Sequence, residues 1–241
     1  MKNIEIKTAD GVVDCLAWAG SEPDSKGNVL FFVDAGGVRP AMERMGQRWA
    51  DAGYSVLIPN VLYRAGKFAP FHMKTVFSDD KERARLFSIL SLATPADIMR
   101  DVGEYLQHFQ GKVGAVGYCF GGTLTTRAAA AYPERIAVAA SIHGGSLVTD
   151  KPDSPHRSLA RVTARMYFGC ADNDRSCPPE HRATLAAALT DAGVRHEIEL
   201  YAGKGHGFAV DDMPVYDPDA CEQHWRKLFT LFGTLSGAAA A

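Results

Sequence analysis

The chain alternates short apolar runs with longer amphipathic stretches, and this alternation predicts its strands and helices. Apolar runs such as 29–33 are typical of strands buried on both faces of a parallel sheet, and Asp10-Gly11 is a strong signal for a turn between two strands. Strands are predicted at 4–8, 12–18, 28–34, 54–58, 112–118, 136–142, 164–169 and 195–201. Helices are predicted at 40–52, 80–92, 95–110, 121–132, 179–192 and 218–232.

Strands that alternate with helices in this way predict an α/β fold with a mostly parallel sheet and helices on both faces. No repeat or long linker divides the 241 residues, so we expect a single domain over 1–241 with a frayed tail at 236–241. The aperiodic segment 61–76 is interpreted either as a lid or pocket wall, or as an ordinary surface crossover. In open α/β sheets the site lies beyond the carboxyl ends of the strands, which directs attention to the residues after Val33, Tyr118, Ile142, Phe168 and Tyr201.

Charge, apolar runs and cysteine content indicate which kinds of partner the protein has. The 26 basic and 28 acidic residues give a net charge of −2 without a block of like charge, which argues against nucleic-acid binding. No apolar run approaches the roughly 20 residues that span a bilayer, and the first residues lack the pattern of a signal peptide. Five scattered cysteines fit reduced thiols. We therefore expect a cytoplasmic protein that acts on a small molecule without a membrane or nucleic-acid partner, as a monomer, with a homodimer left open.

The sequence Gly-Tyr-Cys-Phe-Gly-Gly at 117–122 is the most informative stretch, because it lies where a predicted buried strand gives way to a helix. A nucleophile held on such a sharp turn needs small neighbours two residues away on either side, and Gly117 and Gly121 supply them. The start of the helix places free N–H groups and a positive dipole end near the thiol of Cys119, which favours the thiolate. The sequence thus predicts a catalytic Cys119, with a buried structural cysteine as the alternative.

A nucleophile of this kind needs an oxyanion site, a base and an acid. The backbone N–H groups of Phe120 and Ala35 are the candidate oxyanion donors. His206 lies in a glycine-flanked loop after the last predicted strand and is the candidate base. The acid is expected in the loop after 164–169, where Asp174 is favoured and Asp172 stays open. The order nucleophile, acid, histidine is that of α/β-hydrolases.

The elbow, the loop from Asp174 to Pro178 and the Gly-His-Gly-Phe segment around His206 together closely resemble the dienelactone hydrolase family of α/β-hydrolases. The resemblance extends over nearly the whole chain, and its cysteine elbow is the specific part, since most α/β-hydrolases carry serine there. It implies a triad of Cys119, Asp174 and His206. It also implies thiol-dependent hydrolysis of a small lactone or ester, of the carboxymethylenebutenolidase type, through an acyl-enzyme and without a metal or organic cofactor.

The resemblance also implies a carboxylate partner for the resting thiol. The family places this carboxylate after the third strand, and the matching residue here is Asp34. The best-known members carry glutamate at this position, which is one methylene longer. Asp34 is therefore expected either to contact Cys119 or to cap the end of the strand.

Substrate contacts are expected at a few further positions. Family members that cleave dienelactones hold the substrate carboxylate with an arginine four residues after the catalytic histidine, where this chain has Val210. A second arginine comes from the crossover helix region, where Arg83 and Arg85 stand, although either also fits a solvated helix surface. His143 and Tyr118, at the ends of neighbouring predicted strands, are further candidates, and His143 alternatively closes the pocket floor.

Two other functions remain as alternatives. A thiol hydrolase of the same fold could cleave a thioester, an amide or a carbon–halogen bond instead. A binding protein that keeps only the scaffold is the second, but such proteins usually lose a member of the triad. A dinucleotide-binding reading is disfavoured, because no predicted strand is followed by Gly-x-Gly-x-x-Gly.

Overall fold

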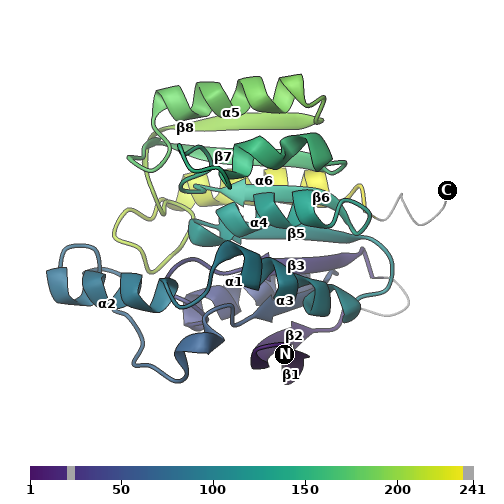
Figure 1. The fold of residues 1–241 in the computed structure, drawn as a ribbon, viewed down its shortest axis with the longest axis vertical. Helices are drawn as coiled ribbons and strands as arrows, with labels where there is room; N and C mark the ends of the chain where they lie inside the picture. The colour runs from purple at the N-terminus through teal and green to yellow at the C-terminus, as the bar shows by residue number, and fades with distance from the viewer. Residues whose placement is uncertain (21–24, 236–241) are drawn as a thin grey trace.

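The computed structural model describes residues 1–20 and 25–235, which form one sheet with helices on both faces (Figure 1). The strand order is β1-β2-β4-β3-β5-β6-β7-β8, parallel from β4 onward, with β1 and β2 antiparallel at one edge. The predicted frayed tail, 236–241, lies outside the described residues. The strand bounds are β1 (Lys2–Thr8), β2 (Gly11–Trp18), β3 (Asn28–Phe32), β4 (Ser55–Pro59), β5 (Val113–Tyr118), β6 (Ile136–Ile142), β7 (Arg165–Asn173) and β8 (His196–Gly205).

The helices form two layers. Trp49 of α1 and Trp225 of α6 pack with ring centroids 5.4 Å apart on one face of the sheet, while α3, α4, η2 and α5 follow one another across the other face (Figure 1). None of the helices in the described part of the chain is long and apolar enough to cross a membrane. The helix bounds are α1 (Pro40–Asp51), η1 (Tyr63–Ala65), α2 (Asp80–Leu90), α3 (Pro95–Gln107), α4 (Phe120–Ala131), η2 (Pro155–Arg161), α5 (Pro179–Asp191) and α6 (Pro218–Phe232).

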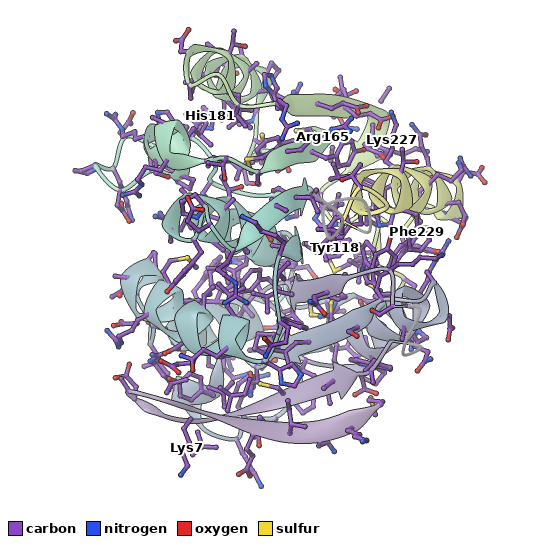
Figure 2. All side chains as sticks on the ribbon, turned by 90° about the vertical axis from the view of Figure 1, so that its right-hand side faces the viewer. Lys7, Tyr118, Arg165, His181, Lys227 and Phe229 are labelled. Carbon is purple, nitrogen blue, oxygen red and sulfur yellow. The ribbon has the colours of Figure 1, made fainter. Side chains whose placement is uncertain are left out.

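The predicted fold class is confirmed, and the register of the sheet explains where the site lies. Phe32 pairs with Gly117 and Tyr118 with Ile142, so β3, β5 and β6 end at the same edge. Side chains fill the space between the sheet and both helix layers, with Tyr118 in the interior and Lys7 at the edge formed by β1 (Figure 2). The loops that leave this common edge therefore start from neighbouring, hydrogen-bonded strand ends.

Two strands are longer than the sequence predicts, and the structure distinguishes the two interpretations of segment 61–76. β7 and β8 run several residues past their predicted ends, because Asn173 pairs with Gly205 beyond a bulge. This extension brings the loops that follow both strands together. The aperiodic segment 61–76 contains η1 and buries Phe71 and Met73. A Cβ added to Gly36 would lie 2.6 Å from Sδ of Met73, so this segment packs as a wall against the loop after β3.

Candidate active site

The turn between β5 and α4 holds Cys119 in a strained conformation. Cys119 has φ 54° and ψ −114°, a combination that residues with a Cβ rarely adopt. A Cβ on Gly117 would lie 2.1 Å from the carbonyl oxygen of Gly121, and a Cβ on Gly121 would lie 2.2 Å from that of Phe32. These contacts involve backbone atoms and cannot relax by side-chain movement. The strand, turn and helix predicted around 117–122 are present, and the thiol stands at the start of α4.

His206 follows β8 directly and meets Cys119. Its Nδ1 lies 2.7 Å from Oδ2 of Asp174, and the thiol of Cys119 is near enough to act on the pKa of His206. Burial disfavours the imidazolium, but the charge of Cys119 and the hydrogen bond to Asp174 raise the pKa of His206 well above its ordinary value. The structure therefore brings together the three side chains expected to form a triad.

Asp174 is the carboxylate at His206. Burial raises its pKa, yet the hydrogen bond and charge of His206 and the bonds from Ser176 lower it below the ordinary value. Ser176 donates from its hydroxyl and its backbone N–H to Oδ1 of Asp174, at 2.6 and 2.8 Å. Asp172, the alternative acid, instead accepts a 3.0 Å hydrogen bond from the N–H of Gly203. Of the two aspartates, Asp174 is the one placed to orient the imidazole.

The loop after β3 is organised by a buried ion-pair network around Arg39. Its guanidinium donates to both oxygens of Asp34, at 2.6 and 2.9 Å, and to both oxygens of Asp212, at 2.7 and 2.9 Å. The N–H of Gly36 also donates to Oδ1 of Asp34, at 2.9 Å. Asp34 thus shapes the loop and is engaged through both oxygens by Arg39. The contact between Asp34 and Cys119 expected from the sequence stays a prediction.

This network joins the two loops that flank the thiol. Asp34 begins the loop that carries Ala35, and Asp212 lies in the loop that follows His206. Although burial disfavours its charge, the bonds to Asp212 and Asp34 raise the pKa of Arg39. Because Arg39 is already bound to two carboxylates, its free capacity for a substrate anion is small.

The backbone donors expected at the oxyanion site occupy suitable positions. Phe120 is the first residue of α4, where helix geometry leaves the N–H without a carbonyl in its own helix. Ala35 is buried between Asp34 and Gly36, whose backbone is fixed by the Asp34 carboxylate. Their convergence on a substrate oxygen stays a prediction.

His143 lies against His206. Its ring centroid is 5.2 Å from that of His206 and 5.5 Å from that of Phe208. The side chain is buried, and neither ring nitrogen has a hydrogen-bond partner among the described residues. Burial, and next the charge of His206, lower the pKa of His143 well below its ordinary value. His143 is therefore a neutral ring behind His206, and its contact with substrate stays a prediction.

The remaining substrate candidates have other partners. Tyr118 is fully buried, and its hydroxyl lies 3.0 Å from Nε2 of His224. Arg83 pairs with Asp80 at 2.6 Å. Arg85 pairs with Glu82 at 2.7 Å and stacks over the ring of Phe71, and Val210 is buried. A role for Tyr118, Arg83 or Arg85 in binding substrate stays a prediction.

A hollow of about 310 Å³ lies beside Ser176, the residue that donates to Asp174. Ser176, which lines it, lies 3.3 Å from Nδ1 of His206. Arg175 and His181 line the same hollow together with residues of the loop after β6, from Ser146 to Asp150. It is large enough for a small organic molecule.

Sequence reasoning missed Ser176 and Arg39. Ser176 follows Asp174 by two residues, a spacing at which an aspartate commonly accepts bonds from the following backbone, so a local signal existed. Arg39 is separated from Asp212 by 173 positions, and no spacing rule connects them. The part of the chain that the structure describes contains no group of three or more His, Cys, Asp or Glu side chains arranged to hold a metal ion.

Comparison with known proteins adds independent information. The model of the "Dienelactone hydrolase family" matches residues 16–236. A "Putative carboxymethylenebutenolidase" of Synechocystis is 25% identical over 218 residues, which cover 86% of this chain and 85% of that protein. A "Probable 2-oxo-3-(5-oxofuran-2-ylidene)propanoate lactonase" of Bradyrhizobium is 28% identical over 118 residues, 48% of either chain.

Solved structures show the same architecture. The crystal structure of a "Putative Dienelactone Hydrolase" from Klebsiella pneumoniae superposes with a TM-score of 0.83 at 19% identity, over 96% of this chain and 97% of that one. A thioesterase domain from the curacin biosynthetic pathway superposes with a TM-score of 0.66 at 12% identity, over 95% of this chain and 99% of that one. At these identities the likeness establishes the α/β-hydrolase fold.

Proposed function

The chain belongs to the dienelactone hydrolase family and is a hydrolase of the α/β fold, and we propose that it cleaves a small lactone or ester through a thioester formed on Cys119. One observation carries the proposal: a half-buried thiol on a strained turn lies near a histidine whose Nδ1 is 2.7 Å from Oδ2 of a buried aspartate. This is the arrangement of an activated nucleophile, its base and the group that orients the base. The names of the two relatives support a lactone as substrate.

The proposed reaction has two halves. Sγ of Cys119, as the thiolate, attacks the carbonyl carbon, and the N–H groups of Phe120 and Ala35 stabilise the oxyanion. When the intermediate collapses, the C–O bond breaks, and the leaving oxygen takes a proton from Nε2 of His206. Neutral His206 then removes a proton from water, which attacks the thioester. The second collapse releases the carboxylic acid and restores the pair of thiolate and imidazolium.

Each supporting residue has a defined task in this scheme. Asp174 keeps Nδ1 of His206 protonated and turned toward the acid, and Ser176 fixes the carboxylate. The neutral ring of His143 adds no positive charge that would compete for the thiolate. The hollow beside Ser176 is the proposed place for the part of the substrate that extends past the reacting carbonyl.

The test is turnover of carboxylated unsaturated lactones, plain lactones and short aryl esters by the wild type, Cys119→Ala and the matched control Cys15→Ala. Cys15 is a buried thiol of β2 that donates to the carbonyl of Val13. We expect Cys119→Ala to lose at least about 10³-fold in kcat/KM, while Cys15→Ala stays close to the wild type. Mass spectrometry after rapid acid quench should show an acyl adduct on the Cys119 peptide.

Two outcomes contradict the proposal in different ways. Full activity in Cys119→Ala would remove the thiol from the mechanism altogether. Failure of the wild type to turn over any member of the panel would exclude lactone and simple-ester hydrolysis. In that second case, thioesters, amides and haloacids are the next substrates to assay with the same variants.

A further inference from the structure

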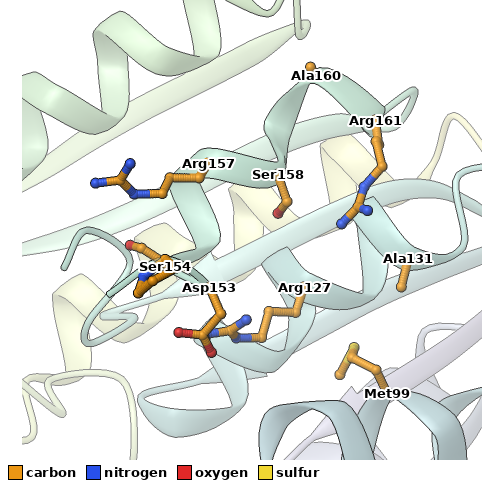
Figure 3. Close-up of a pocket in the computed structure, with 10 residues that line it drawn as sticks. Met99, Arg127, Ala131, Asp153, Ser154, Arg157, Ser158, Ala160 and Arg161 are labelled. Atoms are coloured by element: carbon orange, nitrogen blue, oxygen red, sulfur yellow. The ribbon is translucent and has the colours of Figure 1, made fainter. Parts of the chain in front are cut away.

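A second hollow lies away from the carboxyl edge of the sheet, in the helix layer between α3, α4 and η2 (Figure 3). Its volume is about 480 Å³. Three arginines line it, Arg127 from α4 and Arg157 and Arg161 from η2, together with the carboxylate of Asp153. Arg127 is eight residues after the nucleophile on the same helix, a distance of about 12 Å along the axis. The hollow is thus separate from the triad.

Arg127 is poorly compensated for its degree of burial. Its side chain is only 18% exposed, and its buried Nε has no hydrogen-bond partner among the described residues. Its ion pair with Asp153 is long, 3.3 Å from Nη2 to Oδ2, and Asp153 is itself 57% exposed. Burial lowers the pKa of Arg127, and the charge of Asp153 opposes this only in part. Buried guanidinium groups are normally paired and fully hydrogen-bonded, whereas Arg127 has one long ion pair and a buried Nε without an acceptor among the described residues.

The other arginines add to the positive charge of the hollow. Arg161 reaches toward Arg127 across the hollow, whereas Arg157 lies at the rim (Figure 3). Both are exposed, and no ion pair of either side chain is present in the described part of the chain. Three arginines therefore line a hollow that has a single carboxylate in its lining, that of Asp153.

The remaining lining determines what kind of anion fits. Met99 and Ala131 form an apolar side near Arg127 and Arg161 (Figure 3). A phosphate monoester combines a dianion with three terminal oxygens, which can engage more than one guanidinium, with an organic part for the apolar side. A single carboxylate offers only two oxygens and one charge. The volume is within the range of small-molecule sites.

We propose that this hollow binds a small organic phosphate monoester, with its phosphoryl group on Arg127 and Arg161 and its organic part against Met99 and Ala131. Nε of Arg127 then gains the acceptor that it lacks. Asp153, the present partner of Arg127, is displaced toward solvent, where most of its side chain already lies. Binding at this site does not require the thiol chemistry proposed above.

Phenyl phosphate is the probe, titrated by calorimetry at low ionic strength against protein whose Cys119 has been blocked with iodoacetamide. Saturable binding of one equivalent is expected, at least about fivefold tighter than that of inorganic phosphate or benzoate. Equal binding of inorganic phosphate would overturn the assignment of an organic ester, and tighter binding of benzoate would overturn the assignment of a phosphoryl group.

Variants locate the site. Arg127→Met should weaken binding at least about tenfold, and the double variant Arg157→Gln/Arg161→Gln several-fold. The double variant changes only exposed side chains, so it folds even if Arg127→Met does not. Arg226→Gln, an exposed arginine of α6 on the other face of the sheet, is the matched control and should bind as the wild type does. Absence of saturable binding, or an affinity unchanged in the double variant, would overturn the proposal.

Discussion

The proposed nucleophile, Cys119, and its proposed base, His206, are held in place by different physical forces. The elbow that carries Cys119 is fixed by contact between backbone atoms, because Gly117 and Gly121 leave no room for a Cβ. The loop that carries His206 is fixed by charge and hydrogen bonds, from Asp174 on one side and from the pair of Arg39 and Asp212 on the other.

Because of this difference, substitutions in the elbow and substitutions in the loop of His206 should have different consequences. A clash between backbone atoms cannot be relieved in part by moving a side chain, so the elbow either forms or does not. An ionic network can lose one member and keep its shape, and its strength depends on pH and on burial. Substitutions in the elbow should therefore act on folding, whereas substitutions around His206 should act on the rate, its pH profile or local stability.

The largest expected effect is that of Gly121→Ala. A Cβ there would lie 2.2 Å from the carbonyl oxygen of Phe32 and 2.5 Å from that of Val33, both in backbone that cannot rotate away. We expect a loss of more than about 4 kcal/mol in the free energy of unfolding, or no folded protein. Urea unfolding followed by tryptophan fluorescence measures it.

Gly111→Ala is the matched control for this prediction. Gly111 has φ 68° and nothing within 4 Å of an added Cβ, so only the cost of the backbone conformation applies, about 1–2 kcal/mol. Similar urea midpoints for the two variants would show that the elbow relaxes. The contrast between a sterically fixed elbow and a loop of His206 fixed by charge would then be wrong.

Asp174→Asn tests the hydrogen bonds and charge that hold His206, and it should act on catalysis. The amide cannot carry the negative charge that holds Nδ1–H of His206, so we expect kcat/KM to fall by about 10³-fold. The pH profile of kcat/KM should also change in a definite direction. The pKa of His206 is raised in part by Asp174, so the imidazolium of the variant loses its proton at lower pH. The basic limb of kcat/KM should therefore move to lower pH.

Asp172→Asn separates the two candidate acids. Asp172 accepts from the N–H of Gly203 and not from His206, so its amide variant should keep activity within about threefold of the wild type. A large loss in Asp172→Asn together with a mild one in Asp174→Asn would reverse the assignment of the acid. Unfolding midpoints of both variants exclude a trivial loss of structure.

Local patterns were sufficient to predict the elements and to select Cys119 and His206, which the structure brings together. The run of apolar residues before Cys119 and the glycines around it describe strand, turn and helix within six positions. The order of Cys119, an acid and His206 along the chain follows from the order of the strands. The sequence could not separate Asp172 from Asp174, because both lie in one loop and only contacts with the loop after β8 distinguish them.

Contacts between distant segments are what the sequence did not reveal. The resemblance assigns Asp34 to the thiol, with a cap of the strand end as the alternative, but neither indicates that its carboxylate is engaged by Arg39 and through it connects to Asp212. The ring of His143 has no hydrogen-bond partner in the described part of the chain, and its position depends in the same way on packing from β8 and its loop, through His206 and Phe208. Neither follows from periodicity, since no rule of spacing joins residues of different loops.

Arg39→Met tests how burial sets the contribution of an ion pair to stability, and its expected effect is smaller than that of Gly121→Ala. Removing the guanidinium leaves Asp34, whose side chain is 5% exposed, without its partner. We expect a loss of about 3 kcal/mol in the free energy of unfolding, since a buried charge is left uncompensated. Arg44 and Asp211 join the same two segments in a bidentate pair, but their side chains are 57% and 39% exposed. Arg44→Met should therefore cost less than about 1 kcal/mol.

A second substitution decides whether the cost comes from the orphaned charge. Asp34→Asn in the Arg39→Met background removes that charge and keeps the hydrogen bond from Gly36, so most of the lost stability should return. Equal losses in Arg39→Met and Arg44→Met would mean that burial adds nothing to this network. If the double variant regains no stability, Arg39 acts through its packing. The loop of His206 would then be fixed by steric contacts, as the elbow of Cys119 is.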